Sequence, residues 1–152
     1  FYSNDELYEI IKRSASLLGI TINHQGCNEI AKRSRGTPRI ANRILKRTRD
    51  FAQVKSDGTI NEKIAKEALD ALGIDESGLD DMDKSLLKAL VINFQGGPVG
   101  LDSLGVVVSE NAKTIEEVYE PFLIKEGFIE RTSRGRKATD KAYKLFGIQK
   151  QK

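Results

Sequence analysis

The sequence predicts a mainly α-helical protein with two domains, one of four helices and one of three helices, a β-hairpin and a last helix. Apolar residues recur at helical spacing through most of the chain, so that they share one face of each expected helix. Asparagine, threonine and proline stand where these helices would start, and glycine where they would end. Residues 127–139 instead alternate and turn as a β-hairpin does.

The first two helices have clear ends. The first begins with Asn4 or Asp5 as its N-cap and is ended by Gly19. Its expected inner face consists of Leu7, Ile10, Ile11, Leu17 and Leu18. The second is capped by Asn23 and stopped by Gly36, and its expected inward residues are Cys27, Ile30 and Ala31.

The third helix has the strongest start signal. Thr37 serves as N-cap and Pro38 as the first helical residue, because proline there loses no hydrogen bond that the helix needs. We expect the helix to run to about Lys55. Its apolar face is formed by Ile40, Ala41, Ile44, Leu45, Phe51 and Ala52, and its opposite, basic face by Arg39, Arg43, Lys46 and Arg47.

A domain boundary is expected after the fourth helix, which is capped by Asn61 and closed by Gly73. The stretch 73–83 is acidic and contains glycine, as linkers often do. The sequence therefore predicts domains over residues 1–76 and 77–152.

The second domain has the element order of a winged helix, namely three helices followed by a basic hairpin. Thr114 and Glu117 fit a capping box at the start of the third of these helices. The hairpin would turn at Ser133–Gly135. The expected helices cover Met82 to about Asn93, 101–107, Thr114 to about Glu126 and, after the hairpin, 140–146.

The composition excludes several classes of site. His24 is the only histidine, so no histidine metal cluster or catalytic triad can form. Cys27, the only cysteine, fits a core position. No G-x-x-x-x-G-K-[ST] phosphate loop occurs, and the aspartates of 80–83 lack the ligand spacing of a calcium loop. We therefore expect neither a catalytic residue nor a metal site in this chain.

A cytoplasmic setting without a membrane is expected. No apolar run approaches the roughly 20 residues that span a bilayer, and no signal-peptide pattern opens the chain. The single cysteine cannot form an internal disulfide, which fits a reducing compartment. The sequence starts at Phe1 in mid-pattern and without Met, so we expect it to be a piece of a longer protein.

Charge is distributed unevenly, although the net charge is only +3. Residues 1–75 carry 13 basic and 10 acidic side chains, which gives +3. Residues 76–130 carry 4 basic and 11 acidic side chains (−7), and residues 131–152 carry 8 basic and 1 acidic (+7). Such asymmetry is what a localised contact with a polyanion needs.

Arg39 is a candidate phosphate ligand. It lies in the first turn of its helix, where the helix dipole favours anions and disfavours a cation. The free N–H groups of that turn and a guanidinium fork together suit a phosphate group. The alternative is that Arg39 belongs, like Lys46 and Arg47, to a solvated basic helix face.

The hairpin is a candidate DNA contact. Arg131, Arg134 and Arg136 surround its expected tip, where they could enter a minor groove or follow phosphates. The preceding helix is acidic, with Glu116, Glu117, Glu120 and Glu126 against Lys125. We therefore expect the wing, rather than that helix, to bind DNA with little sequence preference and strong salt dependence. Otherwise the arginines only protect an edge hairpin from aggregation.

Two other functions fit these residues. One is a free-standing winged-helix regulator whose helical half dimerises and which has no ATPase function. The other is a protein-interaction module that offers the acidic block 76–130 to a basic partner.

Seven motifs resemble the C-terminal part of the RuvB family, bacterial AAA+ motors that drive branch migration at Holliday junctions in recombination and repair. They are "FY" (1–2), "RGTPRIANR" (35–43), "RDFAQVKSDGTI" (49–60), "GGPVGLDSL" (96–104), "TIEEVYEPFLI" (114–124), "GFIERTSRGR" (127–136) and "FGI" (146–148). The resemblance covers essentially the whole chain. It implies a small four-helix AAA+ lid followed by a winged-helix DNA-binding domain.

The resemblance also implies roles for single residues. Arg39 matches the sensor-2 arginine that reaches the nucleotide phosphates, Pro38 a lid residue near the nucleotide, and Tyr2 the aromatic residue that lies against the base. Arg131 and Arg136 match positions of DNA contact, with Arg134 between them. A further DNA-contacting arginine of the family is replaced here by Ala112, so that contact is not expected.

Partners and cofactors follow from the same resemblance. A large domain upstream, with both Walker motifs and the arginine finger, would bind ATP or ADP with Mg and would contact RuvA. The full-length protein would form a homo-hexameric ring on double-stranded DNA at Holliday junctions. Nucleotide turnover would tilt the lid through Arg39 and move the wings along the DNA backbone. The chain alone should not hydrolyse ATP.

Overall fold

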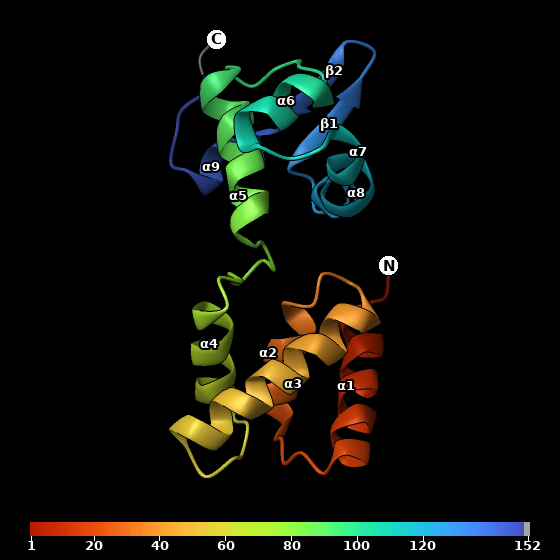
Figure 1. The fold of residues 1–152 in the computed structure, drawn as a ribbon, viewed down its shortest axis with the longest axis vertical. Coiled ribbons are helices and arrows are strands. Elements are labelled where there is room, and N and C mark those ends of the chain that lie inside the picture. The colour runs from red at the N-terminus through yellow and green to blue at the C-terminus, as the bar shows by residue number, and fades with distance from the viewer. Residues whose placement is uncertain (151–152) are drawn as a thin grey trace. The chain divides into compact units, whose positions relative to one another are not determined.

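The computed structural model describes residues 1–150, and its contacts divide the chain into two compact units (Figure 1). The first unit is Phe1–Asp80, and the second starts at Asp81. The boundary predicted at 76/77 lies close by and stays a prediction. Residues 151 and 152, the end of the expected second domain, lie outside the described residues.

The first unit is the predicted set of four helices: α1 (Asn4–Leu18), α2 (His24–Lys32), α3 (Pro38–Lys55) and α4 (Glu62–Ala71). Helix α1 packs against α2 and α3, and α4 packs against the same two helices. Backbone pairing between Ile22 and Ile60 joins the segments that precede α2 and α4.

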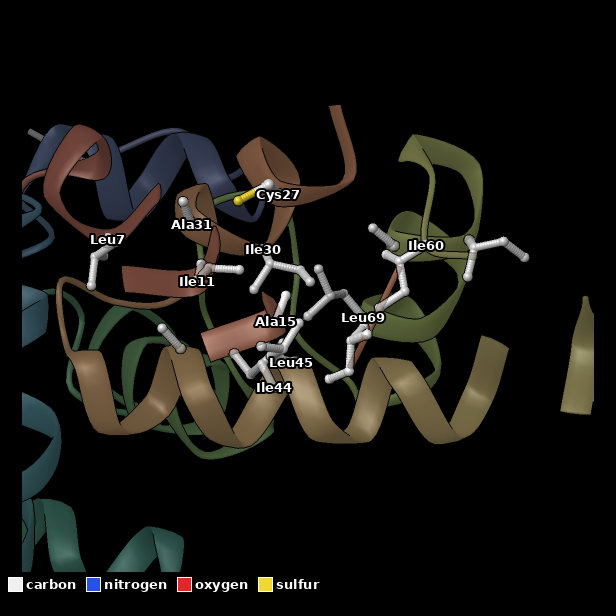
Figure 2. Packing of buried hydrophobic residues seen from close by; sticks show 14 of the residues in the cluster. Leu7, Ile11, Ala15, Cys27, Ile30, Ala31, Ile44, Leu45, Ile60 and Leu69 are labelled. Atoms are coloured by element: carbon white, nitrogen blue, oxygen red, sulfur yellow. The ribbon is translucent and has the colours of Figure 1, made fainter. Parts of the chain in front are cut away.

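All four helices contribute to one apolar core in this unit. Figure 2 shows the side chains of this core gathered between the helices. Its members include Leu7, Ile11, Ala15, Cys27, Ile30, Ala31, Ala41, Ile44, Leu45, Ile60 and Leu69. The predicted apolar face of α3 is confirmed, because its residues are buried or packed against this core, while the basic residues on its other face are exposed.

Three N-caps were predicted correctly, and one was wrong. Asn23, Thr37 and Asn61 precede α2, α3 and α4 as expected. The N-cap of α1, however, is Ser3, whose hydroxyl accepts a hydrogen bond from Glu6 N (3.1 Å) while the Glu6 carboxylate accepts one from Ser3 N. Because Ser3 is the N-cap, the helix begins at Asn4, and Asn4 and Asp5 lie in its first turn.

Two further expectations for these helices were wrong. Leu17 and Leu18 do not face the core, because both lie beyond Ala15, the last buried residue of α1. Leu17 is 77% exposed. Helix α2 ends at Lys32, well before Gly36, since Arg33 already leaves helical geometry.

The second unit follows the predicted winged-helix order. Its elements are α5 (Asp81–Lys88), the π-helical turn η1 (Ala89–Asn93), α6 (Leu101–Val108), α7 (Ala112–Thr114), the π-helical turn η2 (Ile115–Tyr119), α8 (Glu120–Lys125), β1 (Ile129–Thr132), β2 (Gly135–Ala138) and α9 (Asp140–Leu145). The Thr114/Glu117 capping box was wrong, because Asn111 caps α7 by accepting a hydrogen bond from Lys113 N (2.8 Å).

The wing is a hairpin with a third chain segment beside it. Strands β1 and β2 pair antiparallel, with Arg131 directly opposite Arg136. On its other side Arg136 exchanges two backbone hydrogen bonds with Val99: Arg136 N donates to Val99 O (2.7 Å) and Val99 N donates to Arg136 O (3.0 Å). The wing is therefore fixed to the loop that follows η1.

The second unit has its own apolar core beneath the wing. Its buried residues include Leu86, Leu87, Leu90, Leu104, Ile115, Phe122, Leu123, Phe128, Ile129, Ala138, Ala142 and Tyr143. Across residues 1–150, no helix combines the length and apolar character that a membrane crossing requires.

Candidate functional site

The predicted nucleotide ligands of the first unit lie around the start of α3. Tyr2 N donates a hydrogen bond to Gly36 O (2.8 Å), so the first residues of the chain lie against the turn that precedes this helix. Pro38 is the first residue of α3 and Arg39 the second. The fold thus brings Tyr2 to the same corner as Pro38 and Arg39, although they are distant in sequence.

Arg39 is exposed, and within residues 1–150 its side chain forms neither a hydrogen bond nor an ion pair. The first turn of α3 contains no acidic residue, and Thr37 makes no side-chain cap. The first intrahelical bond runs from Ala41 N to Thr37 O (2.9 Å), which leaves the N–H groups of Arg39 and Ile40 without a helical partner. This corner offers positive charge and free donors, the features that bind phosphate.

Two neighbouring arginines have other partners. Arg33 is buried, and it donates to Glu29 (2.8 Å), Asp70 (2.8 Å) and Ile74 O (2.9 Å). Arg35 donates to Gly78 O (3.0 Å). Both therefore hold the end of the first unit together, while Arg39 stays available to a ligand.

The predicted DNA ligands of the second unit lie on the wing, but two of them have a partner that the sequence did not predict. Arg131 Nε donates to Glu120 Oε1 (2.6 Å). Arg136 donates from Nε to Glu120 Oε2 (2.7 Å) and from Nη2 to Oε1 (3.0 Å). Arg134, in the turn between the strands, is exposed and its side chain has no partner in the described part of the chain.

Glu120 is therefore not one of four outward carboxylates on its helix, and that expectation was wrong. Only 1% of this residue is exposed. Burial alone would raise the pKa of the Glu120 carboxyl, but the hydrogen bonds and charges of Arg136 and Arg131 outweigh it, so its pKa lies below the ordinary value. Chiefly through the hydrogen bond to Glu120, the pKa of Arg136 is raised. Glu120 is ionised at neutral pH.

A signal for Glu120 was present in the sequence. A hairpin with its turn at Ser133–Arg134 sets Arg131 directly opposite Arg136, and like charges in that position destabilise a sheet. Such a pair needs an anion close by. The glutamates of the preceding helix were the nearest candidates.

No metal site is formed by the residues that the structure describes. Nowhere among residues 1–150 do three or more histidine, cysteine, aspartate or glutamate side chains come close enough to hold an ion.

Comparison with known protein families assigns both units. A model described as "RuvB AAA lid domain" matches residues 2–75, and one described as "RuvB C-terminal winged helix domain" matches residues 76–147. The chain belongs to the RuvB family. The predicted fold class, a mainly α-helical AAA+ lid followed by a winged helix with a small hairpin, is thereby confirmed.

Individual members of the RuvB family are close to this chain. The Holliday junction branch migration complex subunit RuvB of Fusobacterium nucleatum is 52% identical over 146 residues, which are 96% of this chain and 44% of that protein. The structure of RuvB of Thermotoga maritima, described as a Holliday junction branch migration motor, matches with a TM-score of 0.93 and 48% identity. A point mutant of it matches with a TM-score of 0.94 and 47% identity.

The match to these RuvB proteins is partial in one direction. Each of the two matches covers 98% of this chain but only 50% of the solved RuvB chain. The chain thus spans about half the length of the RuvB proteins that it matches.

Proposed function

We propose that this chain is the nucleotide-sensing and DNA-binding portion of an ATP-driven DNA motor that moves Holliday junctions during recombination and repair. The first unit would supply Arg39 as the sensor-2 residue to the nucleotide phosphates. The second unit would bind the DNA backbone through its wing. The observation that carries the proposal is the exposed, unpartnered Arg39 at the start of α3, with Tyr2 held at the same corner.

ATP or ADP fits this corner through its phosphates. ATP, when bound, would supply the free energy of its hydrolysis to the motor. Arg39 and the free N–H groups of α3 would bind its anionic oxygens, and Tyr2, which is 46% exposed, would offer its ring to the base. Mg would be held through the large domain of the full-length protein.

The surrounding assembly is part of the same proposal. The relative from Fusobacterium nucleatum is named as a subunit of a branch migration complex. We infer a homo-hexameric ring in the cytoplasm, loaded on the junction by RuvA through the large domain. Rotation of the lid through Arg39 would then move the wings along the DNA.

The nucleotide part of the proposal is tested by Arg39→Ala in the full-length protein. ATPase activity and branch migration should both fall while DNA binding survives, because only a phosphate contact is removed. Arg43→Ala is the matched control, since Arg43 lies on the same helix, is also exposed and carries the same charge. Normal branch migration by the Arg39 variant would contradict the sensor role.

The DNA part is tested on the 152-residue chain with Arg131→Ala/Arg136→Ala and, separately, Arg134→Ala. Both should weaken binding to duplex DNA and make its salt dependence shallower. The double variant also strips the buried Glu120 of its partners, so the cleaner measurement is Arg134→Ala. A strong preference for one duplex sequence, unchanged in these variants, would instead favour a free-standing regulator.

The chain by itself should not turn over ATP, because it contains no phosphate-binding loop. A purified 152-residue chain should therefore bind DNA weakly and release no phosphate from ATP. Measured ATP hydrolysis by the pure chain would overturn the assignment.

A further inference from the structure

We propose that Glu120 is a positioning residue of the DNA interface, which holds Arg131 and Arg136 in the arrangement that receives a DNA phosphate. The inference rests on the proposed function, because it assumes that the wing binds DNA. Its basis is the cluster of hydrogen bonds in which one buried carboxylate accepts from both guanidinium groups.

The wing needs such a residue because of its register. Arg131 and Arg136 are directly opposite each other on β1 and β2. Two guanidinium groups in these positions repel, and each would otherwise sample many rotamers. With Glu120 between them the repulsion is cancelled, and both side chains are fixed through their Nε atoms.

A phosphate would not displace Glu120. Release of both arginines would leave an ionised carboxylate buried without a partner, which is strongly unfavourable. A phosphate must therefore be bound by arginines that are still attached to Glu120. Both guanidinium groups retain donors for this, because their bonds to Glu120 use only Nε and Nη2 and leave Nη1 unused.

The two arginines then contribute unequally. The Arg131 side chain is 54% exposed and can reach a phosphate directly. The Arg136 side chain is 20% exposed, and its backbone is bonded to Val99. Arg136 is thus the fixed member of the pair. Together the three side chains carry a net charge of +1, whereas the two arginines alone would present +2 to the DNA.

The experiment compares Glu120→Gln with Glu117→Gln in the 152-residue chain. Both changes remove one negative charge from the same helical segment, but Glu117 is exposed and outside the cluster. Glu116 is less suitable as a control, because its charge already acts on Arg136. Binding to a fluorescent duplex is measured over a range of salt concentrations, and folding is checked by thermal unfolding.

The expected result is that Glu120→Gln binds duplex about tenfold more weakly than Glu117→Gln, as the loss of one charge-assisted hydrogen bond implies. The difference should persist at every salt concentration, since the two variants have equal net charge. Equal affinity of two folded variants, or tighter binding by Glu120→Gln, would overturn the positioning role.

A second measurement follows the Nε–H groups of Arg131 and Arg136 by NMR. Their signals should be protected from exchange in the unmodified chain and should stay so when duplex is added. Loss of protection on DNA binding would mean that phosphate displaces Glu120, which contradicts the proposal.

A third comparison, made on variants that thermal unfolding shows to be folded, tests whether Glu120 acts through the two arginines. In an Arg131→Ala/Arg136→Ala background, Glu120→Gln should change DNA affinity less than about twofold, because the residue acts only through the two arginines. A larger loss there would overturn the inference. The proposed function fails separately, and by a different result: the unmodified chain would not bind duplex at all.

Discussion

At the scale of single residues, two of the buried carboxylates, Glu29 and Glu120, are each held by arginine. Arg33 donates to Glu29, while Arg131 and Arg136 donate to Glu120. Removing the arginine partners of such a carboxylate typically costs about 3 to 5 kcal/mol, because it leaves a buried charge uncompensated. Lysine would not replace these arginines well, since it lacks the planar fork that meets a carboxylate.

Glu120 should make the stability of the second unit depend on pH. Its folded-state pKa lies below the ordinary value of 4.5, so its stabilising effect is fully present above that pH. The effect is lost as the pH falls through the folded-state pKa. Glu120→Gln should lower the free energy of unfolding by about 1 to 3 kcal/mol at neutral pH and by progressively less in acid.

Urea unfolding of the two proteins from neutral pH into acid, followed by a signal from the second unit, measures this difference. Glu117→Gln is again the control, since it should change little. A gap between the Glu120 variant and the unmodified chain that does not narrow in acid would contradict the explanation.

Cys27 should react slowly with thiol reagents. Burial, followed by the charge of Glu9, raises the pKa of its thiol to about 11, and only 2% of the residue is exposed. Both the thiolate fraction and access are therefore small. At mildly alkaline pH, labelling should be far slower than for glutathione and should become comparable once urea unfolds the first unit. Rapid labelling of the folded chain would show that this part of the core opens readily.

At the scale of elements, the segment from α7 to α8 shows why the sequence could not single out Glu120 among the glutamates of this segment. A uniform helix that buries Ile115 would bury Val118, yet Val118 is 57% exposed and Glu120 is buried. The π-helical turn η2, which runs from Ile115 to Tyr119, shifts the side chains that follow it around the helix axis. Pro121, which has no N–H to donate, follows directly and disfavours a regular α-helix there.

Gly26 is an element-scale constraint on the first unit. A Cβ at this position would lie 2.7 Å from Ile60 O. That carbonyl cannot move freely, because it accepts from Asn23 N (3.0 Å), and Ile60 N in turn donates to Thr21 O (2.9 Å). Close packing of α2 against this segment therefore requires glycine.

Gly26→Ala should destabilise the first unit. Overpacking costs about 1 to 3 kcal/mol, which outweighs the gain of up to about 1 kcal/mol in helix propensity. Gln25→Ala, at the exposed neighbouring position, serves as control and should be close to neutral. Denaturant unfolding measures both. A Gly26 variant as stable as the control would mean that the segment around Ile60 can shift.

At the scale of the whole molecule, most of the fold could be predicted, because its elements carry local signals. The α3 start at Thr37–Pro38 and the Ser133 turn depend on neighbours in sequence, and both are present. Long-range features could not be predicted. The pairing of Val99 with Arg136 joins distant segments, and no pattern in either segment indicates it.

In the candidate sites, too, local features could be predicted and tertiary contacts could not. Exposure of Arg39 follows from its helix position alone and was predicted. The partners of Arg33 and Arg136 depend on tertiary contacts, so equally basic residues end in different surroundings. A count of positive charges in the sequence therefore overstates how many are free for phosphate.

Charge placement, rather than net charge, should govern DNA binding by the whole chain. Arg134→Ala and Lys46→Ala each remove one positive charge from a protein of net charge +3. Only Arg134→Ala should reduce the slope of log affinity against log salt, by about 0.9 if one phosphate contact is lost. Titrations of a fluorescent duplex at several salt concentrations give the slopes. Equal slopes for the two variants would mean that the contact is diffuse.

The backbone bonds between Val99 and Arg136 have a consequence for anyone who would transplant the wing. A synthetic peptide of residues 127–139 would keep the arginines of the hairpin. It would lack both the backbone hydrogen bonds to Val99 and the carboxylate of Glu120. Such a peptide would carry the positive charge without the fixed arrangement of Arg131 and Arg136. Transfer of this arrangement to another protein therefore requires three separate segments of the chain, not one loop.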